Sequence, residues 1–246
     1  MPLKLLLAFS AVLLLGEAPA APVRHLEYAF ATQPTASETK SYFNGTLSVD
    51  VLGPTPDGGV LVRMAESWYH TVRPRQPRTC ELYADGTVRC NDGPPYPTES
   101  ELVLFPLLGR DFFKGASLQG ESKWKQKFSL SFRKGTYPAV SEMDLKAAPK
   151  SDGRVVTGTV SGAYNQLNST GAKVIVDNAF MYDVVARVPL IVHEVRMDVP
   201  GGIDNSTSTD LRLIEDSAKN AAEAAELQQL GPVRFQISDF ADEGDI

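Results

Sequence analysis

Apolar and polar residues alternate one by one along most of this 246-residue chain. In the clearest run, Trp124, Phe128, Leu130 and Phe132 face one way, while lysines, serines and an arginine face the other. A period of two residues is typical of a β-strand buried on one side. About eleven segments are predicted as strands: 25–30, 43–51, 60–68, the two arms of 80–90, 124–133, 139–146, 154–162, 172–181, 189–198 and 207–214.

Short connections rich in Gly, Pro, Asp and Ser separate these segments, for example at 53–59, 135–138, 150–153 and 200–202. Such residues favour tight turns. No helical segment recurs between the strands, so parallel βαβ units are not expected. The pattern therefore predicts consecutive antiparallel strands in one sheet, with an apolar face that must be covered.

Two segments depart from the strand pattern. Thr98 and Glu101 form the sequence signature of a helix capping box, and eight of the twelve residues from Leu102 to Phe113 are apolar. Pro106 breaks or kinks that helix, and the segment is too apolar to lie in water. Residues 217–230 are rich in Ala, Glu and Leu and also predict a helix.

The predicted fold is thus all-β: a large curved antiparallel sheet or partly open barrel of about eleven strands. It carries one short apolar helical insert near 98–113 and a C-terminal helix. We expect one all-β domain over 21–216, followed by the helix and an acidic tail over 217–246.

The only two cysteines, Cys80 and Cys90, flank a hairpin signal, Asp85-Gly86. A two-residue loop would pair Cys90 with Glu81. A three-residue loop, with Gly86 left-handed in a bulge, instead places the cysteines opposite each other. The second register also pairs an apolar couple and an opposite-charge couple, so it predicts a Cys80–Cys90 disulfide.

Residues 1–20 have the pattern of a cleavable secretory signal. Lys4 precedes an uncharged apolar run of eleven residues, and small residues follow at Ala18 and Ala20. An apolar run of that length is too short to span a bilayer. We therefore expect cleavage before Ala21 and export to the periplasm or the extracellular space, with no membrane span afterwards. An oxidising compartment would let the disulfide form.

Few motifs carry chemistry. The stretch from residue 151 to 246 has 7 basic against 15 acidic residues, which argues against nucleic-acid binding. The three histidines, His25, His70 and His193, lack metal-site spacing, and His193 is predicted as a core histidine with a satisfied ring. No nucleophile elbow or phosphate loop is present. We expect no cofactor, no metal and no catalytic residue.

The predicted layout resembles the unclosed barrels of bacterial periplasmic lipid and lipoprotein carriers, although no motif carries this resemblance. It implies a binding module whose sheet and helical insert enclose an apolar ligand such as a lipid. The expected ligand-binding residues are Trp68, Leu102, Phe105, Leu108, Phe112, Trp124, Phe128 and Phe132. The same residues could instead fill a core, which would make the protein an envelope or extracellular scaffold; an enzyme is the third alternative.

A basic loop follows Trp68, with Arg73, Arg75 and Arg78 interleaved with prolines. These three arginines are the expected contacts for an anion. The alternative is an exposed connection that prolines keep stiff, since so few basic residues make a weak electrostatic patch.

Overall fold

A computed structural model describes residues 22–34, 43–69, 75–95, 97–109, 122–132, 135–149, 154–165, 173–199, 206–220 and 223. For β7, and for parts of β6, β8, β9 and β10, it describes the backbone alone. The elements within these residues are eleven strands and one helix, in chain order β1 (Arg24–Pro34), β2 (Phe43–Pro54), β3 (Val60–Trp68), β4 (Arg78–Leu82), β5 (Thr87–Cys90), α1 (Glu99–Leu104), β6 (Ser122–Phe132), β7 (Gly135–Pro149), β8 (Val155–Asn165), β9 (Lys173–Asp183), β10 (Val188–Val199) and β11 (Ser206–Asp216).

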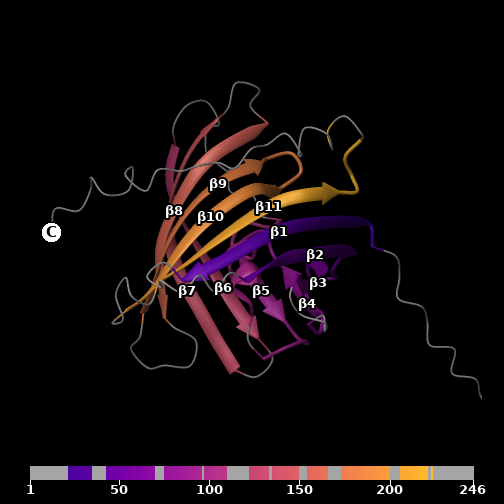
Figure 1. Cartoon of the computed structure of the whole chain (residues 1–246), viewed down its shortest axis with the longest axis horizontal. Coiled ribbons are helices and arrows are strands. Elements are labelled where there is room, and N and C mark those ends of the chain that lie inside the picture. The colour runs from indigo at the N-terminus through magenta and orange to yellow at the C-terminus, as the bar shows by residue number, and fades with distance from the viewer. Residues whose placement is uncertain are drawn as a thin grey trace, which may run out of the picture.

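The strands pair in a ring that follows chain order and joins β11 back to β1 (Figure 1). Every pairing but one is antiparallel, as the short connections predict. The exception is β5 with β6, which run parallel, so the prediction of a wholly antiparallel sheet is wrong there. Parallel neighbours need a long connection to carry the chain back, and residues 91–121, which include α1, provide it.

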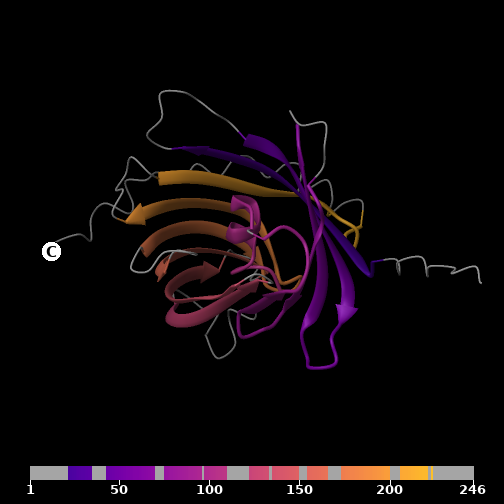
Figure 2. The same cartoon turned by 90° about the horizontal axis from the view of Figure 1, so that it is seen from below.

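The pairing between β5 and β6, which we call the parallel seam, is short. Only Ser129 to Phe132 of β6 pair with β5, while β6 pairs with β7 along nearly its whole length. Among the described residues, the rest of that edge of β6 has no strand beside it. The result is the strongly curved, partly open barrel that the alternation predicts, and Figure 2 shows its curvature from below.

The barrel interior contains the apolar members of the alternating strands together with α1. Figure 2 shows the helix inside the curve of the sheet, and it packs against β1, β10 and β11. The largest fully buried apolar side chains of this core are Tyr28, Tyr182, Phe105, Phe180, Leu26, Leu47, Met64, Leu104, Leu107 and Leu130.

The predicted apolar insert is confirmed as far as the structure describes it. Thr98 is the N-cap of α1, and the reciprocal bonds of a capping box link it to Glu101. The helix ends at Leu104, and irregular turns carry the chain on to Gly109, whose φ of 69° is left-handed. The predicted signal segment and residues 110–113 lie outside the described residues, as does nearly all of the predicted C-terminal helix.

Ion pairs close the barrel end where β1 begins and β11 finishes. Arg24 donates two hydrogen bonds, of 2.9 and 2.6 Å, to the Asp216 carboxylate and a third to the Ala186 carbonyl. Asp183, which is buried, pairs with Arg154 and Lys219. The polar groups at this end are therefore used to hold strands together.

The cysteine hairpin has the predicted three-residue register. Cys80 lies opposite Cys90 and the two are bonded, Glu81 faces Arg89, and Leu82 faces Val88. Gly86 has a φ of 90°, the left-handed conformation that this loop requires. The short-range pairing rules thus predict this part of the barrel residue by residue.

Reducing this disulfide should lower the free energy of unfolding by about 2.8 kcal/mol, because the bond closes an eleven-residue loop in the unfolded chain. Urea unfolding of the oxidised and reduced protein measures the difference. The double variant Cys80→Ala/Cys90→Ala is the control, since its stability should not respond to the reductant. Equal stability of the oxidised and reduced protein would contradict the expectation.

Candidate functional site

A pocket of about 330 Å³ lies at the other end of the barrel, where β1 and β3 finish and β2 and β11 begin. We call it the mouth pocket. Four strands and the segment that leads into α1 form its wall, and it is lined by Phe30, Thr32, Pro34, Phe43, Glu66, Trp68, Arg75, Pro97, Thr98, Glu99 and Thr207.

Aromatic rings form one side of the mouth pocket. Phe43 and Trp68 lie with ring centroids 4.9 Å apart and planes tilted by 58°, and Phe30 also lines the pocket. A glycine makes this close approach of β2 and β3 possible, because a Cβ on Gly45 would lie 1.9 Å from the Ser67 carbonyl oxygen. The wall can therefore pack against an apolar or cationic ligand.

Glu66 supplies a buried carboxylate beside this aromatic wall. Its side chain accepts a hydrogen bond of 2.7 Å from the Trp68 indole Nε1 and one of 2.6 Å from the Ser100 hydroxyl. Because Trp68 lies on β3 and Ser100 on α1, the carboxylate joins the helix to the barrel wall. These two donors also fix its orientation toward the pocket.

Arg75 is the cation of the mouth pocket. Its guanidinium carbon lies 4.6 Å from the centre of the Trp68 ring, and its Nε is 3.5 Å from Glu66 Oε2. Its side chain is 43% exposed. Its two terminal nitrogens donate no hydrogen bond to any other described residue.

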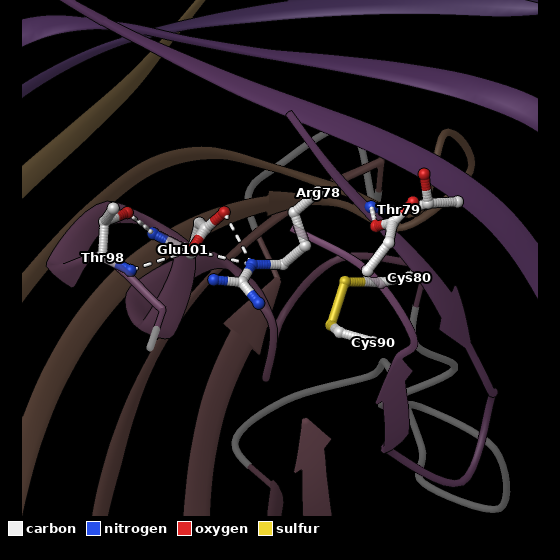
Figure 3. Close-up of a disulfide and its surroundings, with 7 residues drawn as sticks. Arg78, Thr79, Cys80, Cys90, Thr98 and Glu101 are labelled. Atoms are coloured by element: carbon white, nitrogen blue, oxygen red, sulfur yellow. Dashed lines mark hydrogen bonds and ion pairs between the residues drawn. A yellow bond between two sulfur atoms is a disulfide. The ribbon is translucent and has the colours of Figure 1, made fainter. Parts of the chain in front are cut away.

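A second layer of buried charges lies behind the pocket, around α1. Arg78 donates from Nε to both carboxylate oxygens of Glu101, at 3.1 and 3.2 Å, and Figure 3 shows this pair next to the capping box and the disulfide. Arg196 pairs with the buried Glu194 and with Glu99, a partly exposed residue that itself lines the mouth pocket.

Burial raises the pKa of both inner carboxyls. Arg78 and the Thr98 amide lower the pKa of Glu101 in turn. Arg196 and Asn178 do the same for Glu194. Arg78 beside Glu101 and Arg196 beside Glu194 therefore offset part of the cost of burying these two carboxyls. Together the two layers hold four carboxylates, from Glu66, Glu99, Glu101 and Glu194, against three guanidiniums, from Arg75, Arg78 and Arg196.

The structure separates the residues predicted to bind an apolar ligand. Trp68 lines the mouth pocket, whereas Phe105 and Leu108 are buried in the core and Leu102 packs against it. Phe112 lies outside the described residues, and so do the side chains of Trp124, Phe128 and Phe132. Of the described members of the predicted set, only Trp68 is placed to contact a bound molecule.

The three arginines of the predicted anion contact do not form one site in the structure either. Arg75 lines the mouth pocket, and Arg73 lies outside the described residues. Arg78 is 1% exposed and paired with Glu101, so it is not placed to meet an anion from solution. The prediction that Arg78 lies in a loop is wrong. It is instead the first residue of β4, and its side chain is buried in the barrel.

His193 has a partnered ring, as predicted, but it lies on the outer face of β10. Its Nδ1 is 2.7 Å from an oxygen of Asp210 on β11, and this hydrogen bond raises the pKa of His193. The inner face of the strand carries Val192, Glu194 and Arg196. The core placement is therefore wrong, because two charged residues occupy the inward positions.

Sequence reasoning missed several residues of the site, notably Phe30, Phe43, Glu66 and Glu99. One signal was available: Glu66 lies in phase with Val62, Met64 and Trp68, so the apolar face of that strand carries one carboxylate. A charged residue on an otherwise buried face indicates a built polar site or an ion pair.

Within the described part of the chain, no group of three or more His, Cys, Asp or Glu side chains is arranged to hold a metal ion. None of the described helices has the length and apolar character needed to cross a bilayer. The chain matches no protein-family model, no curated protein and no solved structure.

Proposed function

We propose that this chain is an exported, non-catalytic binding protein that holds a small, partly apolar molecule in the mouth pocket. The observation that carries this proposal is a pocket of about 330 Å³ with an aromatic wall and a buried, oriented carboxylate. Ligand sites commonly combine an apolar lining with a few convergent polar groups, and this volume lies at the small end of their range. The disulfide is consistent with an oxidising compartment.

The ligand is proposed for the mouth pocket rather than for the space between sheet and helix. Phe105, Leu107 and Leu108 fill that space and are buried in the core cluster. This packing also favours the second candidate function, a scaffold or interaction protein of the envelope or extracellular space with a filled core. The two functions differ in whether the mouth pocket takes up a molecule.

Three small aromatic probes of different charge decide between these functions: benzyltrimethylammonium, benzyl alcohol and phenylacetate. The measurement is an NMR titration that follows the indole N–H signal of Trp68, assigned through Trp68→Phe. At least one probe should shift this signal with saturation. Thr207→Trp should abolish the shift, because the new ring occupies the mouth pocket, whose wall includes Thr207.

The matched control is Ser67→Trp, which adds the same ring to an exposed position on β3. It should bind the probes as the wild type does. If no probe shifts the Trp68 signal, or if Thr207→Trp binds them as well as Ser67→Trp does, the binding function is wrong and the scaffold is favoured.

A further inference from the structure

We propose that the mouth pocket selects an organic cation, an ammonium or guanidinium group on a small apolar body, and that Arg75 is its intramolecular competitor. This inference rests on the proposed binding function and names the chemical class of its ligand. In the unliganded protein Arg75 occupies the cation position, and a ligand would displace it.

The first support is the position of Arg75 itself. Its guanidinium lies over the face of Trp68 at 4.6 Å and next to the Glu66 carboxylate at 3.5 Å. An aromatic face beside a carboxylate is the arrangement by which proteins bind organic cations. The pocket is thus already seen with a cationic group of its own chain in place.

The second support is how weakly Arg75 is held. Its side chain is 43% exposed, and within the described residues the polar and aromatic partners of this side chain are Trp68 and Glu66. A guanidinium normally forms several directed hydrogen bonds where it has a fixed structural role, as Arg24 does with Asp216 and Ala186. Arg75 can therefore leave the pocket without breaking a hydrogen-bonded network.

The third support is the need of Glu66 for a positive partner. The carboxylate is buried, and Trp68 and Ser100 hold it in place through neutral hydrogen bonds. Arg75 is the one described cation paired with it, because Arg78 pairs with Glu101 and Arg196 with Glu99 and Glu194. A buried carboxylate left unpaired is costly, so a group that replaces Arg75 must be positive.

The same charges oppose an anionic ligand at Arg75. Without Arg75, the two layers hold four carboxylates against two guanidiniums. An anion that approached Arg75 in the pocket would also approach Glu66, whose oxygen lies 3.5 Å from the Arg75 Nε. The pocket therefore favours a cation over an anion of the same size.

The test compares Arg75→Gln with Arg89→Gln, using the three probes and the Trp68 signal. Arg89 is the matched control, because it also stacks on an aromatic ring, Tyr83 at 4.8 Å, and its loss changes the net charge equally. Benzyltrimethylammonium should bind Arg75→Gln about tenfold more tightly than wild type and should bind Arg89→Gln as wild type. Glu66→Gln should weaken its binding by about tenfold or more, with thermal melts checking that this variant folds.

The probes separate failure of this inference from failure of the proposed function. If phenylacetate or benzyl alcohol binds as tightly as benzyltrimethylammonium, or if Arg75→Gln weakens binding of the cation, the pocket binds molecules but the cation inference is wrong. If no probe shifts the Trp68 signal in wild type or in Arg75→Gln, the binding function itself is wrong.

Discussion

Replacing Phe105 with alanine should lower the free energy of unfolding by about 3 to 5 kcal/mol. The ring is 1% exposed and belongs to the core cluster inside the barrel, directly after α1. Its removal leaves a cavity, and Gly109, which bonds to the β9–β10 turn, and the capped start of α1 limit how far the segment can move to fill it. For a chain of this size the melting temperature should fall by about 6 to 20 °C.

Leu102→Ala on the same helix is the matched control. Leu102 is only partly buried, so this variant should lose no more than about 1 to 2 kcal/mol. Neither residue lines the mouth pocket, and both variants should bind the probes as wild type does at temperatures where they are folded. A Phe105→Ala protein as stable as Leu102→Ala would show that the segment is not part of the core. Weaker probe binding with unchanged stability would instead show that it acts as a lid.

The strands were predictable because their pattern is local. Each places apolar residues toward one face and polar residues toward the other, and every predicted segment is a strand. Several strands run longer than predicted, and the turn predicted at 135–138 is wrong, because β7 begins at Gly135. The cysteine hairpin was predictable at residue level because three kinds of cross-strand pair agree on one register. The capping box of α1 is also local, since its two residues are three positions apart.

The parallel seam between β5 and β6 was not predictable in the same way. Whether two consecutive strands run parallel depends on where the intervening chain travels, and residues 91–121 could have formed a surface excursion. The described part of this connection includes α1, which lies inside the barrel against β1, β10 and β11 and not on the surface. Apolar composition predicted that the segment is buried, but not against which strands.

The mouth pocket was only partly predictable, because its residues come from distant parts of the chain. Trp68 and Arg75 were identified as site residues, but the sequence offered no reason to place Phe30 or Thr207 beside them. The prediction of His193 as a core residue was wrong because the alternate positions of that strand, Glu194 and Arg196, are the ones that point inward. Those inward charges pair with each other and also with Glu99 on α1 and Asn178 on β9, which the strand's own sequence does not reveal.

Glu101→Gln should destabilise the protein by about 3 to 5 kcal/mol. The amide can still accept the Thr98 N–H bond of the capping box, so the helix cap is kept. What changes is one partner of Arg78: its guanidinium is 1% exposed and would meet a neutral amide at residue 101 in place of a carboxylate. A buried charge without its counter-charge is the costly state, so Arg78→Met should be destabilising as well.

The double variant Arg78→Met/Glu101→Gln tests this cause, because it removes both charges. It should be more stable than the sum of the two single changes predicts, and urea unfolding of all four proteins measures the coupling. Arg63→Met is the control for an ordinary ion pair. Arg63 is 34% exposed beside Asp50 on the outer face, and its loss should cost no more than about 1 kcal/mol. If Glu101→Gln costs as little as Arg63→Met, or if the double variant shows no coupling, the buried pair does not hold α1 in the barrel.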